Sequence, residues 1–165
     1  MDIVQARIDI LNWITSFVER PHPLLDDWAP CPYARRARLD SKISIREGKL
    51  DPYADLMHAE LDGLSVICWV YDRELMTSSD FFAQVRSVNQ GFLVPRDLIA
   101  LGDHPDSPEI VNDVCMNQGT YALVFLQCLS ELNSMSKNLA PKGYYYRWSE
   151  SYLTDLFEFR QDPRT

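Results

Sequence analysis

Apolar residues recur along the chain with spacings that predict an alternation of helices and strands. Spacings of three and four residues place side chains on one face of a helix, and they predict five helices at residues 3–19, 51–62, 77–92, 121–139 and 149–159. Alternating or continuous apolar runs predict three strands at residues 42–46, 64–71 and 98–101. The expected order is therefore α-β-α-β-α-β-α-α.

Residues that favour helix ends support several of these boundaries. Pro21-His22-Pro23 cannot continue the first helix, while Asp51-Pro52 places a capping residue before a proline suited to a first helical turn. Thr77 and Ser149 are expected caps of the helices that follow them. Gly102 is expected to stop the third strand, and the polar loop that follows to contain a short helix at residues 108–114.

Alternation of strands and helices predicts an α/β fold in a single domain over residues 1–165. We expect three strands joined by right-handed crossovers, with residues 64–71 at the centre because that run is apolar on both faces. The aromatic segment 144–148 fits either a fourth, edge strand or a packed loop.

Composition, cysteine spacing and net charge restrict the kind of protein and the compartment that the sequence fits. With 46% hydrophobic and 24% charged residues in 165, the chain can bury a core without a disulfide. Its four cysteines form no CxxC pair, so we expect free thiols in the cytoplasm, with Cys68 and Cys128 buried.

The start of the chain lacks the apolar core of a secretion signal, and no apolar run approaches the roughly 20 residues of a membrane helix. A net charge of −8 disfavours nucleic acid as a partner.

Polar residues follow each predicted strand. Arg46-Glu47, Asp72-Arg73 and Asp103-His104 would gather at one edge of the sheet if the three strands are parallel. Open α/β sheets bind ligands outside the carboxyl ends of their strands, so this edge is a candidate small-molecule site. The alternative is that strand ends meet solvent and collect polar residues for that reason alone.

A cysteine between two prolines is the second candidate feature. In Ala29-Pro30-Cys31-Pro32-Tyr33-Ala34 the thiol lies in a stiff segment, and Arg35 and Arg36 follow closely. Neighbouring cations, and the amides of any helix that opens at Tyr33 or Ala34, would lower the pKa of the Cys31 thiol and activate it. The alternative is a structural thiol in a rigid turn.

His104 directly follows a predicted strand, within a polar loop that also holds Asp106. Histidine transfers protons near neutral pH, so Cys31 and His104 form a chemically sensible nucleophile and base. The alternative is an incidental surface histidine. A metal site using Cys115 as well has no support from spacing, and no metal is predicted. Phosphate-binding glycine loops and the common hydrolase motifs are missing from the sequence, so nucleotide-dependent and classical hydrolase functions lack support, and the sequence leaves the cofactor unknown.

These motifs resemble a family of bacterial proteins known only as a domain of unknown function. The family has an N-terminal helix, a Cys-Pro-Phe-Ala segment, a His-Pro segment after a strand, and an asparagine-containing loop before a long helix. Cys31-Pro32-Tyr33-Ala34 and His104-Pro105 match these segments, and Asn112 or Asn117 matches the loop, over roughly residues 8 to 135. Tyr33 replaces the usual phenylalanine and Arg35 the usual lysine. The resemblance implies no activity, but it directs attention to Cys31 and His104 together.

The leading hypothesis is a small-molecule-binding α/β domain with its pocket at the strand carboxyl ends, and the sequence leaves open whether it is an enzyme. The candidate catalytic residues are Cys31 and His104, and the candidate ligand-binding residues are Arg35, Arg46, Asp72 and Asp106. We expect Cys31 and His104 to line one pocket with Arg35 or Arg46. The alternative is a non-catalytic interaction module that uses the aromatic C-terminal segment or an exposed helix face. The sequence predicts no oligomeric state.

Overall fold

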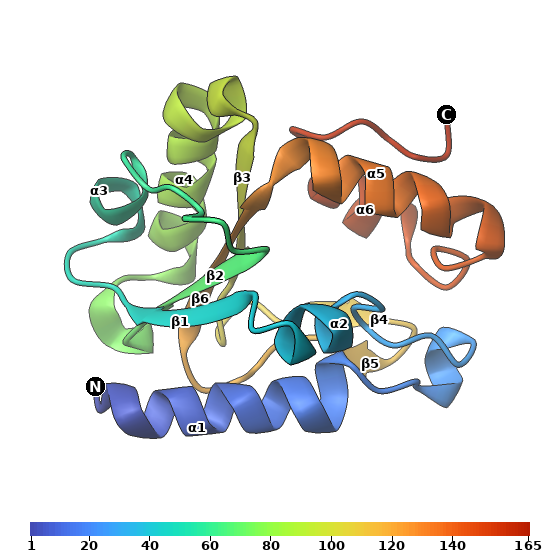
Figure 1. The fold of residues 1–165 in the computed structure, drawn as a ribbon, viewed down its shortest axis with the longest axis horizontal. Coiled ribbons are helices and arrows are strands. Elements are labelled where there is room, and N and C mark those ends of the chain that lie inside the picture. The colour runs from blue at the N-terminus through green and yellow to red at the C-terminus, as the bar shows by residue number, and fades with distance from the viewer.

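A computed structural model describes residues 1–165 and shows an α/β protein whose helices pack on a mixed four-stranded sheet (Figure 1). The strands of this sheet are β1 (Ile43–Glu47), β2 (Val66–Tyr71), β3 (Leu98–Asp103) and β6 (Ala122–Cys128). The α-helices are α1 (Ile3–Trp13), α2 (Ala34–Leu39), α3 (Pro52–Leu56), α4 (Ser78–Val88), α5 (Leu129–Leu139) and α6 (Glu150–Leu156). One turn of π-helix extends α1 and another extends α4, over Ile14–Val18 and Asn89–Leu93.

The three predicted strands exist and run in one direction. The sheet order is β1-β2-β6-β3; β1 pairs in parallel with β2, and β6 is antiparallel to both β2 and β3. β2 has a partner on each side, as its apolar sequence predicts. The carboxyl ends of β2 and β3 also meet at one edge, because Arg73 after β2 forms an ion pair with Asp106 after β3.

The prediction of a single helix over residues 121–139 is wrong, because its first part is the strand β6. Alternate residues of β6 contact opposite faces of the sheet: Val124 and Leu126 lie in one core, Leu123 in the other. A strand buried on both faces is apolar throughout and has no period of two. The helix-like spacing of Tyr121, Phe125 and Cys128 therefore carried no structural information.

Local sequence signals placed several helix starts correctly. Asp51 accepts the N–H of Ala54 at 2.8 Å, Thr77 accepts that of Asp80 at 3.1 Å, and Ser149 accepts that of Tyr152 at 3.2 Å. The α3 helix is shorter than predicted and ends at Leu56.

Three details of the loops and strand ends differ from the predictions or settle an open choice. The predicted helix at residues 108–114 is a hairpin of β4 (Ile110–Val111) and β5 (Val114–Cys115). Its turn residues Asn112 and Asp113 both have positive φ, 46° and 66°, as a two-residue hairpin turn requires. β3 continues past Gly102, and the aromatic segment 144–148 is a packed loop rather than a strand.

Helices cover both faces of the sheet (Figure 1). α3 and α4 pack on one face, where Tyr71, Phe81 and Val124 belong to the larger apolar core. α1 packs on the opposite face, where Ile10 meets Val70 and other residues of a second core. We call these the α4 face and the α1 face.

α5 leaves the sheet directly from β6, and Asp97 holds its first turn. The carbonyl of Asp97 accepts the N–H of Leu129 at 2.9 Å, and its carboxylate accepts the N–H of Ser130 at 2.8 Å. Beyond α5, edge-to-face aromatic contacts join Tyr144, Tyr145 and Phe157 into a third core around α6. This arrangement places α5 and α6 opposite α1 and α2 in Figure 1.

All four cysteines are free thiols; Cys68 is buried as predicted, whereas Cys128 is only half-buried. None of the helices combines the length and the apolar character needed to cross a bilayer.

A substitution at Gly48 tests how closely the Tyr71 side chain packs against the residue that follows β1. A Cβ atom on Gly48 would overlap the ring of the buried Tyr71, whereas one on Gly91 would meet nothing within 4 Å. We expect Gly48→Ala to lower the free energy of unfolding by about 1–3 kcal/mol, as overpacking does. Gly91→Ala is the control and should be neutral or slightly stabilising. Urea unfolding measures both, and equal stabilities of the two variants would contradict the packing described.

Candidate functional site

A cavity of about 400 Å³ lies on the α1 face of the sheet, and α5 and the C-terminal aromatic segment close its far side. Most of its lining residues are hydrophobic, 22 of 32. Trp13 and Phe17 come from the first helix, Leu101 and Phe125 from the sheet, and Met135 from α5. Segments far apart in the sequence therefore build one largely apolar chamber.

The cavity lies towards the amino ends of β1 and β2, not at the strand carboxyl ends as predicted. Ile43 begins β1 and Val66 begins β2, and both line the cavity together with Gln127 near the end of the antiparallel β6. The residues that terminate β1, β2 and β3 are not part of its wall. This cavity therefore differs from the predicted site, because it is framed by the departure of α5, which strand direction does not reveal.

Cys31 lines this cavity, as its prediction as a site residue requires. Its N–H donates to the carbonyl of Val18 at 3.0 Å, and Tyr144 donates its hydroxyl to the carbonyl of Pro30. These bonds hold the proline-flanked segment between the first helix and the aromatic cluster. Cys31 is exposed as a residue, although protein surrounds its thiol closely.

The surroundings of Cys31 raise its pKa, contrary to the predicted activation. Burial raises the pKa of the thiol, and hydrogen bonds from the amides of Tyr33 and Ala34 only partly oppose this. The predicted contribution of amides at the start of α2 is thus present. Arg35 is exposed and makes no ion pair, and it is not among the groups that shift the thiol.

His104 lies on the opposite face of the sheet from Cys31. It is fully buried, and its ring centroid is 5.3 Å from that of Phe81 in the core of the α4 face. Its Nδ1 accepts the N–H of Asp106 at 3.2 Å, and its buried Nε2 has no hydrogen-bond partner. The prediction that Cys31 and His104 line one pocket is therefore wrong, since His104 does not reach the cavity.

The four predicted ligand-binding residues also lie outside the cavity wall. Arg35 is exposed on α2, and Arg46 binds the carboxylate of Asp62 at 3.2 Å. Asp72 is exposed and accepts the N–H of Glu74 at 2.9 Å, while Asp106 pairs with Arg73. Three of the four thus bond to other groups of the protein, and none of the four lines the cavity with Cys31.

The polar edge at the end of β3 is a hydrogen-bonded network. Buried Asp103 accepts the amide of Asn117 at 2.6 Å and the N–H of Gln118 at 2.9 Å. Nearby, Glu109 accepts the hydroxyl of Tyr152 at 2.9 Å. Burial, with a smaller contribution from the Asp103 charge, raises the pKa of Glu109 to about 7. The network ties the loop after β3 to α6.

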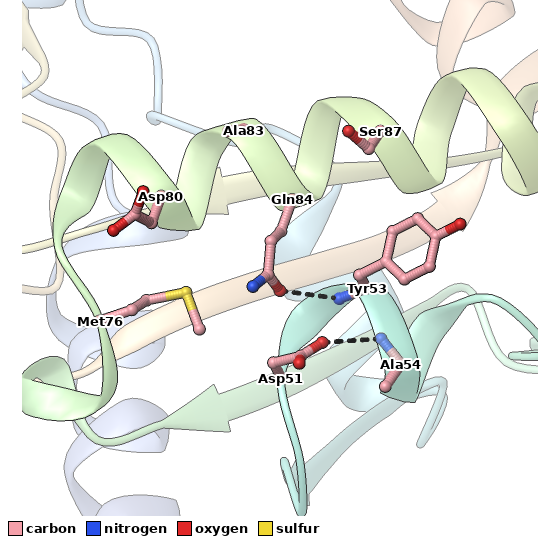
Figure 2. Close-up of a pocket in the computed structure, with 8 residues that line it drawn as sticks. All are labelled: Asp51, Tyr53, Ala54, Met76, Asp80, Ala83, Gln84 and Ser87. Atoms are coloured by element: carbon pink, nitrogen blue, oxygen red, sulfur yellow. Dashed lines mark hydrogen bonds between the residues drawn. The ribbon is translucent and has the colours of Figure 1, made fainter.

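A second hollow is a shallow groove between α3 and α4, open to solvent (Figure 2). Gln84 accepts the N–H of Tyr53 at 3.2 Å, and Asp51 caps the same helix. These polar side chains already accept N–H groups from the first turn of α3. The groove therefore offers a ligand mainly a shallow surface, without these two groups as binding partners. No group of three or more His, Cys, Asp or Glu side chains is placed to hold a metal ion.

The cavity contains one cation that the sequence analysis missed. Arg160 follows α6, lines the chamber and forms no ion pair with any carboxylate. It donates to Ser136, stacks over the Phe157 ring at 5.0 Å, and has its pKa lowered by burial. The sequence Phe159-Arg160-Gln161 carries no motif that marks this residue. Only the folding of α6 against α5 brings it to the cavity.

Compared with known proteins, the chain matches no protein-family model, no curated protein and no solved structure. The resemblance based on the Cys31 and His104 segments stays a prediction.

Glu109 should make stability depend on pH. Because its pKa is raised from an ordinary 4.5 to about 7, the folded state holds this proton more tightly than the unfolded state. The resulting stability is fully present below about pH 4.5 and is lost as the pH rises through about 7, with an upper limit of about 3 kcal/mol. Urea unfolding from pH 4.5 to 8 measures this loss. Glu109→Gln, which can still accept the Tyr152 hydroxyl, should flatten the dependence; an unchanged slope in that variant would exclude Glu109 as its source.

The raised pKa of Cys31 should make the thiol slow to react. At pH 7 less of it is thiolate than in an unfolded peptide, so N-ethylmaleimide should modify Cys31 more slowly in the native protein than in urea. Mass spectrometry of digested samples follows this residue individually. Faster modification in the native protein at pH 7 would instead indicate an activated thiol and support a nucleophile.

Proposed function

We propose that this protein binds an apolar small molecule in the chamber between the α1 face of the sheet and α5. The observation that carries the proposal is the cavity itself, about 400 Å³ in volume with 22 hydrophobic residues among the 32 that line it. Small-molecule sites have volumes of roughly 300–1,000 Å³, mostly apolar walls and a few polar groups. Both its size and its chemistry fit that class.

The residues around the chamber support an organic ligand with aromatic or alkyl character. Trp13, Phe17, Phe125 and Trp148 offer ring surfaces from three different segments. Burying apolar surface contributes about 25 cal/mol per Å², so a ligand filling the chamber gains affinity mainly from exclusion of water. The four free thiols fit a protein of the reducing cytoplasm, which would place the ligand there.

We favour ligand binding over the alternative of catalysis in which Cys31 and His104 act as a pair. Cys31 has a raised pKa, and His104 is on the other face of the sheet. The thiol contributes to the wall of the chamber and requires no activated form for that purpose. The non-catalytic interaction module remains the competing hypothesis, and a chamber that binds no small molecule would favour it.

Protection of Cys31 from alkylation tests the proposal. The probe is N-phenyl-1-naphthylamine, a neutral apolar dye whose fluorescence rises in apolar surroundings. We expect saturable binding to one site, and we expect bound dye to slow modification of Cys31 by N-ethylmaleimide about tenfold or more. Cys115 is the internal control, because it is an exposed thiol outside the cavity wall and should react at an unchanged rate.

Two outcomes would overturn the proposal. Either the dye fails to bind saturably, or it binds while Cys31 and Cys115 react at their original rates. In the second case the dye occupies another surface, such as the groove between α3 and α4.

A further inference from the structure

One guanidinium in the apolar chamber lacks a counter-ion. Arg160 is the cavity-lining arginine without an acidic partner; the other, Arg36, pairs with Asp40 at 2.6 Å and is largely exposed. Lys42, the remaining cation of the wall, is also exposed and donates to the carbonyl of Gly63 at 3.1 Å. An arginine stays charged at neutral pH, so the partly buried charge of Arg160 is not neutralised by the protein.

The hydrogen bonds of Arg160 leave one nitrogen of its guanidinium group without a partner. Nε lies 3.4 Å from the Asn133 side-chain oxygen, and Nη2 reaches the Leu132 carbonyl at 3.4 Å and the Ser136 hydroxyl. Nη1 has no hydrogen-bond partner and is not sealed from solvent. The guanidinium is therefore oriented by three neutral groups while one of its donor nitrogens stays free.

Ser136 adds a second donor beside this guanidinium. Its oxygen accepts the Tyr145 hydroxyl at 2.9 Å and Nη2 of Arg160, which occupies both lone pairs. Its own hydroxyl hydrogen is then left to donate to another group. Ser136 is 4% exposed and lines the chamber. A free hydroxyl donor and a free guanidinium donor at one end of an apolar cavity together suit an acceptor that carries negative charge.

We propose that the ligand of the chamber is an apolar monocarboxylic acid whose carboxylate binds Arg160 and Ser136 while its hydrocarbon part fills the apolar cavity. This inference rests on the proposed function and specifies the class of its ligand. A carboxylate matches the planar fork of a guanidinium, and charge-assisted hydrogen bonds in a partly buried site are stronger than neutral ones. The stacking of Arg160 over Phe157 holds the fork in place before the ligand arrives.

Displacement of bound N-phenyl-1-naphthylamine by decanoate and by 1-decanol tests the inference, because the two share a ten-carbon chain and differ in charge. Decanoate should displace the dye at a concentration at least about tenfold lower than decanol does, which corresponds to about 1.4 kcal/mol. In Arg160→Met, which keeps an unbranched apolar side chain, this preference should disappear while decanol binds as before. Arg160→Lys keeps the charge and should retain part of the preference.

Arg36→Met is the matched control, because it removes the other arginine of the same cavity wall and should leave the preference for decanoate unchanged. Equal displacement by decanoate and decanol in the unmodified protein would overturn the inference and leave the proposed function standing. Loss of the preference in Arg36→Met but not in Arg160→Met would also overturn it. Failure of the dye to bind at all would overturn the proposed function itself. Unchanged decanol binding in Arg160→Met shows that this variant is folded.

Discussion

The bonds between Asp97 and the start of α5 determine where the part of the chain after β6 lies. Asp97 has a positive φ of 59° just before β3, and it accepts backbone N–H groups of Leu129 and Ser130 just after β6. Because β3 and β6 are paired, with Leu98 opposite Cys128, these bonds act at one corner of the sheet. The Ser130 hydroxyl also donates to the same carboxylate and lowers its pKa, so the cap stays charged near neutral pH. α5 therefore leaves the sheet instead of lying flat along it.

The chamber exists because α5 leaves the sheet in this way. With α5 directed away, the α1 face is covered partly by α1 and partly by side chains that reach across from the C-terminal segment. Tyr144 binds the carbonyl of Pro30, and Arg147 pairs with Asp26 at 3.0 Å, so the aromatic segment is fastened to the loop that carries Cys31. The aromatic core around α6 then fixes the position of Arg160. A cavity framed by separately anchored segments can stay open, whereas a single continuous core would fill it.

The positions of the predicted site residues show that the face on which a side chain lies depends on where its strand ends. Cys31 lines the cavity, held there in a proline-bounded segment that has few conformations, and its role as a site residue stays a prediction. His104 was placed on the wrong face. Successive side chains of a strand point to opposite faces, and the structure alone shows that β3 extends to Asp103, which faces away from the α4 core that His104 joins. Likewise, the polar residues at the strand ends were predicted as ligand-binding groups, but Arg46 and Asp106 have acidic or basic partners within the protein.

The sequence by itself determined the local features: the caps Asp51, Thr77 and Ser149, the buried strand β2, and the rigid segment around Cys31. Each depends on neighbouring residues whose preferences act over one or two turns of chain. Only the tertiary structure decided that residues 122–128 form a strand between β2 and β3, since backbone pairing on both sides outweighed a helix-like spacing. It alone also brought Arg160 and Ser136 together, because their 24-residue separation is closed by the packing of α6 on α5 and not by any local preference.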